Sequence, residues 1–343
     1  MDVVIGMLLA IIVLWVALRA LPAGAEGRLP LPYLIALIPF LWIPSLLLAV
    51  ASALIGNWML AGIATAFAVI ILLRVPIYRR RNRETLRETN TSTGINGPHE
   101  TCRTVTVMTL NCRYGRADAA AIVDTVRDRH VDILALQELT QGLVAALDDA
   151  GIRGLLPHRQ LGEDRPTDNG GFNGLWTRFA PVDSTSSSVD IPAADVPMIT
   201  VSSDDGSAGT VIAFASAHTK SPMRGCRAWS QGIIGLGQLA RRHDIVTPQA
   251  TVVLGDLNCG IDHPSFRRLL AAGFRDAGMA ATRRPGMTFP SWLVWPRIEL
   301  DHVLMNGPID VEHAETLIIP GSDHLATVAT LATCRPRHGV SRG

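Results

Sequence analysis

The chain lacks the cysteine content of a disulfide-rich or zinc-binding fold. Its 343 residues include five cysteines, which are scattered and form no CxxC pair. This excludes a disulfide framework and a cysteine-based zinc cluster, and it predicts buried or unreactive thiols instead. Lysine is also scarce, because Lys220 is the only one and all other basic residues are arginines. We interpret that bias as compositional.

An excess of positive charge is missing from the larger, C-terminal part of the chain. Eight of the 31 basic residues and four of the 30 acidic residues precede position 96, so the remainder carries a net charge of −3. Affinity for DNA or RNA comes mainly from basic side chains that neutralise phosphates. A mildly acidic domain without a basic stripe is therefore a poor non-specific nucleic-acid binder.

Charged side chains are missing from Leu29 to Leu73, a run of 45 positions. One helix crosses a bilayer with about 20 residues, so this run predicts two crossings, with Gly56-Asn57 as the turn between them. The apolar run from Val3 to Leu18 predicts another crossing, because Arg19 at its end can extend its charge to the membrane surface. A signal peptide is the alternative for that first run, but a basic N-terminal stretch is missing. We therefore expect three transmembrane helices within residues 1–76.

A basic segment follows the apolar part of the chain. Six arginines lie between positions 74 and 87. Residues 89–100 are polar and turn-forming, so residues 77–101 are predicted to be a juxtamembrane segment and linker. We expect a folded domain over residues 102–335 and a disordered tail over 336–343.

Strand and helix patterns alternate through residues 102–335. The predicted strands are 104–110, 131–136, 171–177, 197–201, 211–217, 251–254, 298–305, 311–318 and 325–331, and the predicted helices are 117–130, 141–150, 227–242 and 263–270. Several strands are apolar along their whole length and need cover on both faces. We therefore expect an α/β fold in which two sheets pack together with helices outside.

Polar residues sit at the ends of many apolar strands. They are Asn111, Glu138, His218, Asp256 with Asn258, Asp301, and Asp323 with His324. Each alone is more typical of a loop or turn, but together they predict one pocket at a rim of the sheets. Carboxylates gathered there would repel one another unless a cation or proton intervened. Mg²⁺ is a suitable cation, because it binds one or two carboxylates together with phosphate oxygens and water.

The order of these motifs resembles a known family. LNCRYG, LQEL, the strand-terminal His218, GDLN, ELDHV and SDH follow the order seen in the endonuclease/exonuclease/phosphatase superfamily, and the resemblance covers roughly residues 103–333. It implies a four-layer α/β/β/α sandwich of the DNase I type and metal-dependent hydrolysis of phosphoesters. The superfamily includes nucleases, sphingomyelinases and inositol phosphatases, so the substrate stays open.

The resemblance also implies a metal site. Glu138 would be the principal ligand of Mg²⁺, or alternatively of Mn²⁺, with Asn111 beside it. Asp323 would support the metal or the phosphate.

Catalytic roles follow from the same resemblance. Asp256 would activate the attacking water and Asn258 would orient the phosphate. His218 and His324 would contact the phosphate and stabilise developing charge or protonate the leaving oxygen. Asp301 would hold one imidazole in its useful tautomer. These roles agree with phosphoryl chemistry, which depends mostly on positioning and charge neutralisation.

Substrate contacts are expected in the stretch RRPGMTFPSW, which resembles a substrate loop of the family. Thr288 and Trp292 are predicted contacts, and Arg283 is predicted to meet a phosphate. Packing is the alternative role for Trp292, and surface solvation is the alternative for Arg283. Phe172 stands where some nucleases place a tyrosine on the phosphate, which disfavours a nuclease-like site.

Three functions are compatible with these patterns. The first is a membrane-anchored phosphatase or phosphodiesterase acting on a lipid-linked phosphate, since tethering raises its local concentration at the bilayer. The chain resembles membrane-anchored bacterial members associated with glycopeptide resistance, which implies lipid-pyrophosphate chemistry in the cell envelope. The second is an anchored nuclease, which the acidic domain disfavours. The third is a catalytically inactive membrane scaffold, which the intact motif residues disfavour.

Two sequence patterns disagree about the side of the membrane on which the folded domain lies. The arginines before position 88 favour a cytoplasmic domain. However, antiparallel pairing of the first and last strands would bring Cys102 and Cys334 together near the rim opposite the site. A disulfide there would indicate an oxidising compartment. With the envelope resemblance, this favours an extracytoplasmic domain on a multi-pass membrane protein of undetermined oligomeric state.

Overall fold

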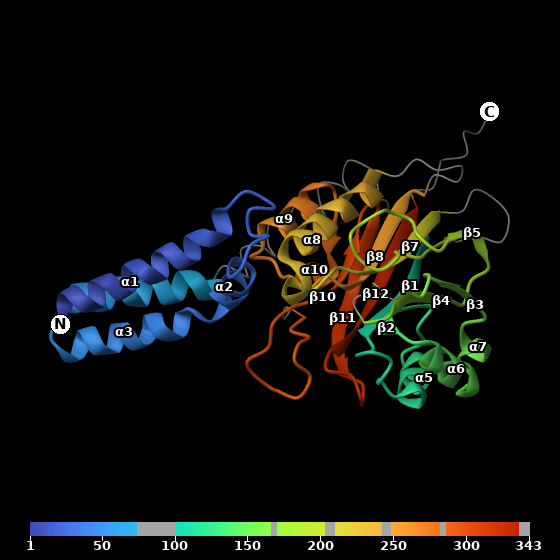
Figure 1. Cartoon of the computed structure of the whole chain (residues 1–343), viewed down its shortest axis with the longest axis horizontal. Coiled ribbons are helices and arrows are strands. Elements are labelled where there is room, and N and C mark those ends of the chain that lie inside the picture. Colours follow the sequence, from blue (N-terminus) through green and yellow to red (C-terminus); the bar gives the residue numbers. More distant parts are fainter. Residues whose placement is uncertain (74–100, 166–169, 203–209, 242–247, 282–285, 336–343) are drawn as a thin grey trace.

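The computed structural model of the chain describes residues 1–73, 101–165, 170–202, 210–241, 248–281 and 286–335. A bundle of apolar helices forms one end of the molecule, and two sheets with their helices form the other (Figure 1). The N-terminus lies at the far tip of the bundle, so α1 (Asp2–Ala17) runs toward the sheets.

The sheet domain contains two mixed six-stranded sheets. The first has the order β11 (Ile309–Ile318), β12 (Leu325–Arg335), β1 (Thr101–Asn111), β2 (Ile133–Leu139), β4 (Phe172–Thr177) and β3 (His158–Leu161). The second has the order β5 (Pro181–Thr185), β6 (Met198–Ser202), β7 (Val211–His218), β8 (Ala250–Asp256), β10 (Asp301–Met305) and β9 (Arg275–Asp276). In each sheet one pair of neighbours is parallel, β1 with β2 and β7 with β8, and the other neighbours are antiparallel.

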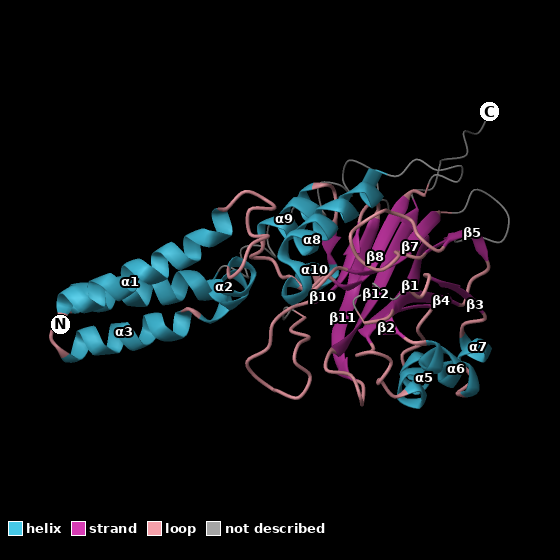
Figure 2. Cartoon of the chain, in the orientation of Figure 1, coloured by secondary structure: helices cyan, strands magenta, loops and turns pink. Residues whose placement is uncertain are grey.

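Three apolar cores hold the layers together. One lies between the sheets and includes Val107 and Phe214. A second surrounds Trp176 and joins the first sheet to α5 (Ala119–Asp128) and α6 (Gln141–Asp149). A third surrounds Trp229 and joins the second sheet to α8 (Pro222–Gly235) and α9 (Pro264–Ala271). The predicted arrangement of two sheets with helices outside is confirmed (Figure 2).

Several elements differ from the prediction. The strands β3, β5 and β9 were not predicted, because they are short and β5 is mostly exposed, so no buried apolar run marks them. Helix α8 begins at Pro222, earlier than predicted, since Ser221 precedes it as N-cap and proline suits the first helical position. Two further short helices, α7 (Ile152–Leu155) and α10 (Ala277–Ala280), were also not predicted.

The first and last strands pair as expected. β1 runs antiparallel to β12, and the Cα atoms of Cys102 and Cys334 are partners in the register. The side chains of both cysteines lie outside the described part, so the disulfide stays a prediction. The predicted linker and the tail also fall outside the described residues.

The expectation of three transmembrane helices is not supported. In the described residues, one helix, Asp2–Ala20, is long and apolar enough to cross a membrane. The helix Leu31–Phe40, which contains α2 (Leu31–Leu37), adds a second crossing only if it forms one span with α3 (Trp42–Leu54), from which it is bent by 57°. Pro39 precedes this bend and cannot donate a backbone hydrogen bond. The apolar helix Trp58–Leu73 has 16 residues and is too short to count as a candidate span.

The connection between α1 and α2 is docked on the sheet domain. Glu26 is completely buried, and its carboxylate accepts hydrogen bonds from the backbone N–H groups of Gly24 and Ser265 near the start of α9. Arg267 of α9 donates to the carbonyl of Arg19, and His263 Nε2 lies 3.0 Å from the carbonyl oxygen of Pro32. This connection therefore attaches the apolar helices directly to the sheet domain.

Candidate active site

Six strands bring polar side chains to one rim of the two sheets. Asn111 ends β1, Glu138 lies near the end of β2, His218 ends β7, Asp256 ends β8, Asp301 begins β10 and His324 directly precedes β12. The parallel pairs end at this rim, whereas β10 and β12 run in the opposite direction and begin there. Strand direction thus gathers residues that are far apart in the sequence.

Asp256 is the centre of this group. Its Oδ2 atom accepts a hydrogen bond of 2.9 Å from Asn111 Nδ2 and lies 3.7 Å from the Nε2 atoms of both His218 and His324. Glu138 completes the group, because its Oε1 atom lies 3.9 Å from His218 Nε2. The structure therefore brings these five predicted residues into one site.

The backbone at Glu138 is shaped to aim its carboxylate. The register of β2 with β4 is irregular between Leu136 and Leu139, as in a β-bulge, and Glu138 has the left-handed φ of 53°. Bulges and positive φ values at non-glycine residues are typical of functional sites. The Tyr114 backbone N–H donates to Glu138 Oε2 at 2.9 Å. Gly171 permits the close approach, since a Cβ there would lie 2.2 Å from the Leu139 carbonyl oxygen.

The motif GDLN forms a tight turn after β8. A Cβ on Gly255 would lie 1.7 Å from the carbonyl oxygen of Ala217, so only glycine fits between these parallel strands. Asn258 has a φ of 51°, and its backbone N–H donates to Asp256 Oδ1 at 2.8 Å. Its Nδ2 atom donates to the Thr219 carbonyl at 3.2 Å. The turn thus fixes Asp256 and Asn258 relative to each other.

Burial disfavours the charged form of two carboxylates of the site, Glu138 and Asp256. Burial raises the pKa of Glu138, although hydrogen bonding by Asn111 opposes the shift. Burial likewise raises the pKa of Asp256, and the nearby His324 opposes it. Buried carboxylate oxygens beside an amide are a donor set that fits a hard divalent cation. Glu138, Asp256 and Asn111 are therefore the residues able to hold one.

The histidine His324 forms a pair with Asp301. Its Nδ1 atom lies 2.8 Å from Asp301 Oδ2, so the carboxylate fixes the orientation of the ring. Burial alone would lower the pKa of His324, but Asp301 and Asp256 outweigh this and raise the pKa to about 10. The imidazole is therefore a cation at neutral pH. Asp256, Asp301 and His324 also lie close enough to share an ion, although His324 Nδ1 and Asp301 Oδ2 are already engaged with each other.

The second histidine of the site, His218, has the opposite charge state. Burial lowers its pKa despite the neighbouring Asp256, so the ring is neutral. Its Nδ1 atom is buried without a hydrogen-bond partner among the described residues. One neutral and one cationic imidazole therefore flank the same carboxylate.

The family model described as the endonuclease/exonuclease/phosphatase family matches residues 108–324. The chain belongs to the endonuclease/exonuclease/phosphatase family. Members of this family are hydrolases of phosphoesters. The matched range begins in β1 and ends at His324, so it contains the whole rim described above.

Solved structures share the fold at low sequence identity. TDP2 from D. rerio, complexed with a single-strand DNA product, has a TM-score of 0.52 at 15% identity and covers 66% of this chain and 98% of its own. A functionally unknown conserved protein from Enterococcus faecalis has a TM-score of 0.52 at 16% identity, covering 67% and 100%. An endonuclease/exonuclease/phosphatase from Bacteroides vulgatus has a TM-score of 0.50 at 18% identity, covering 67% and 98%. A search of curated proteins finds no match.

Two further predicted residues, Asp323 and Thr288, lie beside the rim. Asp323 is partly exposed, and its Oδ2 atom lies 3.5 Å from Arg113 Nε. Thr288 is completely buried, and its hydroxyl accepts hydrogen bonds of 3.2 Å from the backbone N–H groups of Leu300 and Asp301. Thr288 therefore supports the Asp301 backbone and does not face a substrate.

Of the other two predicted substrate contacts, the structure describes Trp292. Trp292 is 65% exposed, and its ring meets that of Phe289 edge to face at 5.9 Å. Phe289 in turn contacts the ring of His324 at 4.9 Å, so Trp292 is linked to the site through one aromatic neighbour. Arg283 lies outside the described residues.

Two cationic residues beside the rim, Arg113 and Arg224, were not predicted. Arg113 faces Asp323, and Arg224 donates to the hydroxyl of Tyr114, with its guanidinium 5.7 Å from the Tyr114 ring centre. Arg113 and Tyr114 belong to the motif LNCRYG, where their positive φ values of 48° and 55° follow Asn111. Their place in this motif was the sequence signal that could have identified Arg113 and Tyr114 as site residues. No sequence signal marked Arg224, because its position near Tyr114 depends on how α8 packs against the sheet domain.

Proposed function

We propose that the chain is a membrane-anchored, Mg²⁺-dependent hydrolase that cleaves the phosphate ester or pyrophosphate of a lipid-linked substrate. The observation that carries this proposal is the arrangement around Asp256. Two buried carboxylates, a neutral imidazole and an imidazolium face one space at the rim. Family membership supports phosphoester hydrolysis, and the apolar helices beside the domain support a membrane-proximal substrate.

The metal in this proposal is Mg²⁺, with Mn²⁺ as the alternative. Glu138 would be its principal ligand, with Asn111 beside it and Asp323 in support. Such an ion neutralises phosphate charge and polarises a phosphoryl oxygen. The buried oxygen donors fit it, because burial disfavours their charges unless a cation is near.

The protein residues divide the proton transfers between them. Asp256 accepts the proton of the attacking water, a role helped by its raised pKa. His324, held by Asp301, is already an imidazolium and donates to the leaving oxygen. The neutral His218 donates a hydrogen bond to the phosphate, and Asn258 orients it through its side-chain amide. Arg113 attracts the anionic substrate at the mouth.

The proposal is tested with the full-length protein in nanodiscs and a panel of phosphate compounds. We expect Mg²⁺-dependent turnover of undecaprenyl pyrophosphate that exceeds turnover of sphingomyelin, inositol phosphates and duplex DNA. Excess EDTA should abolish it. Glu138→Ala should lower kcat by at least about 100-fold without unfolding the protein, because the metal site is lost. Undiminished turnover in EDTA or in this variant would refute the metal-dependent mechanism.

A nuclease is the second candidate, and the same panel tests it. The D. rerio TDP2 structure is a complex with a single-strand DNA product, although the likeness establishes the fold alone. The net charge of −3 after position 95 disfavours DNA. Cleavage of plasmid DNA with Mg²⁺, without turnover of the lipid pyrophosphate, would reverse this order.

The proposed location of the active site is the extracytoplasmic face of the cell membrane. The register that makes Cys102 and Cys334 partners supports a disulfide and an oxidising compartment. The six arginines between positions 74 and 87 in the sequence favour the cytoplasm instead. Protease accessibility in intact cells decides between the two sides. Cleavage of the domain only after lysis would place it inside.

A further inference from the structure

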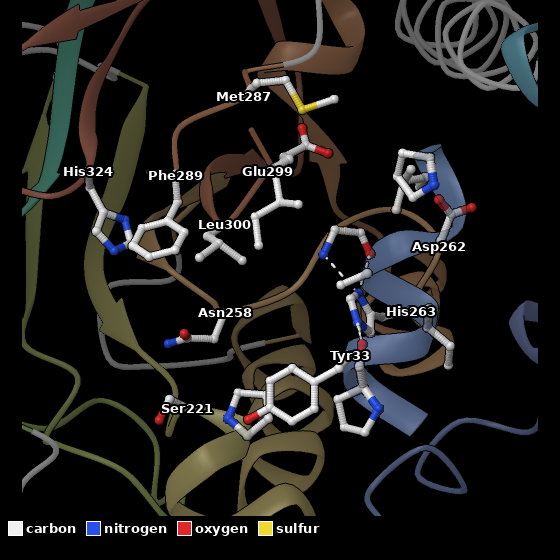
Figure 3. A pocket seen from close by; sticks show the side chains of 18 of the residues that line it. Tyr33, Ser221, Asn258, Asp262, His263, Met287, Phe289, Glu299, Leu300 and His324 are labelled. Carbon is white, nitrogen blue, oxygen red and sulfur yellow. Dashed lines mark hydrogen bonds between the residues drawn. The ribbon is translucent and has the colours of Figure 1, made fainter. Parts of the chain in front are cut away.

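An apolar cavity of about 320 Å³ lies between the sheet domain and α2 (Figure 3). This volume is within the range of about 300 to 1,000 Å³ that is typical of small-molecule sites. Thirteen of its twenty lining residues are apolar, among them Tyr33, Ala36, Phe289 and Leu300, and the polar ones include Asp262 and Glu299. The cavity is therefore suited to hydrocarbon rather than to a sugar or a nucleobase, because buried polar groups without partners are costly.

One end of the cavity is the active site. His324 and Asn258 both line it, and Figure 3 shows their side chains on the same side as Phe289 and Leu300. A molecule whose phosphate meets His324 can therefore extend directly into the apolar space.

The other end is formed by the N-terminal segment. Pro32, Tyr33 and Ala36 of α2, and Pro39 just beyond it, line this wall. Nearby, the indole ring of Trp295 meets Phe40 edge to face at 6.0 Å, and Trp295 and Val294 are 59% and 91% exposed. Exposed tryptophans beside apolar helices are typical of a membrane–water interface. The cavity thus extends from the catalytic rim to the apolar N-terminal segment.

Buried polar contacts hold this wall of the cavity in place. The buried Glu26 carboxylate binds the start of α9, and His263, whose Nε2 atom contacts the Pro32 carbonyl oxygen, also lines the cavity. His263 Nδ1 lies 3.0 Å from the Gly260 nitrogen, so both ring nitrogens are engaged. The position of α2 is therefore fixed by buried polar contacts.

We infer that this cavity binds the hydrocarbon chain of the phosphorylated amphiphile whose phosphate is cleaved at the rim, and that α2 supplies the chain-binding wall. The inference rests on the proposed function and names its substrate class as chain-bearing phosphates, recognised by the carbons next to the phosphate. Affinity then comes largely from removing this hydrocarbon from water.

The test uses n-alkyl pyrophosphates with two to ten carbons and the full-length protein in nanodiscs. Each methylene that enters the cavity should raise kcat/KM about fourfold until the space is filled, so the longest probe should exceed the shortest by at least about 100-fold. Phosphate release with Mg²⁺ gives turnover, and calorimetric titration gives affinity without requiring turnover.

Two substitutions on adjacent positions of α2 provide the contrast. Ala36 lines the cavity, so Ala36→Trp should fill it and reduce the ratio between the ten-carbon and two-carbon probes by at least about tenfold. Leu37 is 45% exposed and does not line the cavity, so Leu37→Trp should keep the wild-type ratio. If Ala36→Trp does not fold, the chain-length series on the wild-type protein still tests whether the cavity binds the hydrocarbon chain.

The outcomes separate this inference from the proposed function. Equal turnover of all probes by the wild-type protein would overturn the chain site while leaving the hydrolase intact. Absence of turnover at every length would refute the hydrolase, and titration would then decide the chain site by whether affinity rises with length. Decan-1-ol binding as tightly as decyl pyrophosphate would show a lipid site independent of phosphate and would also overturn the inference.

Discussion

Two histidine–aspartate pairs on strand β10 have the same local geometry but opposite surroundings. Asp301 and His302 are consecutive, so their side chains point to opposite faces of the sheet. Asp301 meets His324 between the sheets, whereas His302 meets Asp276 on the helix-covered face, and each pair has an Nδ1–Oδ2 distance of 2.8 Å. Each imidazole also contacts a phenylalanine ring, Phe289 for His324 and Phe266 for His302.

The other ring nitrogen distinguishes the two pairs. His302 Nε2 lies 2.7 Å from the carbonyl oxygen of Cys259, so both of its nitrogens are engaged by the protein. His324 Nε2 lies 3.7 Å from the nearest carboxylate oxygen of Asp256 and faces the cavity. A buried histidine–aspartate pair is therefore a candidate for catalysis only when one nitrogen faces the site. By this criterion we propose that His324 acts on the substrate and that His302 stabilises the fold.

The largest expected effect is on the catalytic pair. His324→Ala should lower kcat by about 1,000-fold, because the cationic donor to the leaving oxygen is lost. Its melting temperature should stay close to that of the wild-type protein. Turnover with Mg²⁺ and thermal melting monitored by circular dichroism are the two measurements. If His324→Ala keeps at least a tenth of the wild-type kcat, the distinction between a catalytic and a structural histidine–aspartate pair is wrong.

The structural pair should give the reverse result. Asp276→Asn keeps an oxygen for the hydrogen bond from the Met279 N–H at the start of α10 but removes the charge beside His302. We expect a loss of about 3 kcal/mol in unfolding free energy, because a buried charged partner is removed. The kcat of the folded fraction should change less than twofold. Denaturant titration and initial rates at a stabilising temperature check both parts.

The pH dependence of this destabilisation sharpens the comparison. Burial would lower the pKa of His302, but Asp276 and the contact with Cys259 outweigh it and raise the pKa well above its usual value. The stabilisation is therefore fully present below about pH 6.5, the unfolded pKa, and is lost as pH rises through the folded pKa. The stability gap between wild type and Asp276→Asn should thus be larger at pH 6 than at pH 9.5. A constant gap would indicate that His302 is neutral in the folded protein.

The smallest expected effects concern the two phenylalanines. Phe266 is completely buried, so Phe266→Leu should cost about 1 to 2 kcal/mol of stability and leave kcat unchanged. Phe289→Leu should affect stability less and raise KM severalfold, since Phe289 lines the cavity next to His324. Melting curves measure the stability of both variants, and substrate titrations measure their KM. Together they show which phenylalanine contributes to stability and which to substrate binding. Equal stability losses with unchanged KM would contradict the division.

Much of the site could be predicted because it depends on local patterns. Apolar strands that end in Asn111, Glu138, His218 or Asp256 are visible in the sequence, and strand direction alone brings these ends together. The motif ELDHV, however, contains both Asp301 and His302. Which of them faces the site depends on the register of β10 with β8, where Asp301 is paired with Asp256.

Long-range packing explains what was not predicted. Thr288 carries no sign in the sequence that its hydroxyl would hold the backbone of Asp301. Glu26 is a single acid in an apolar region, and its partner Ser265 is 239 positions away. Three crossings were expected because the uncharged run is long, yet a long run does not reveal a bend of 57° near Leu41.

The burial of Glu26 has a practical consequence for protein production. A soluble version that starts at residue 101 would leave the Ser265 backbone N–H and an apolar groove open to water where the N-terminal segment now lies. Such a fragment should be prone to aggregation and should treat long and short substrates alike. Its specificity would then describe the truncation rather than the enzyme, so the N-terminal residues belong in every preparation used to search for the natural substrate.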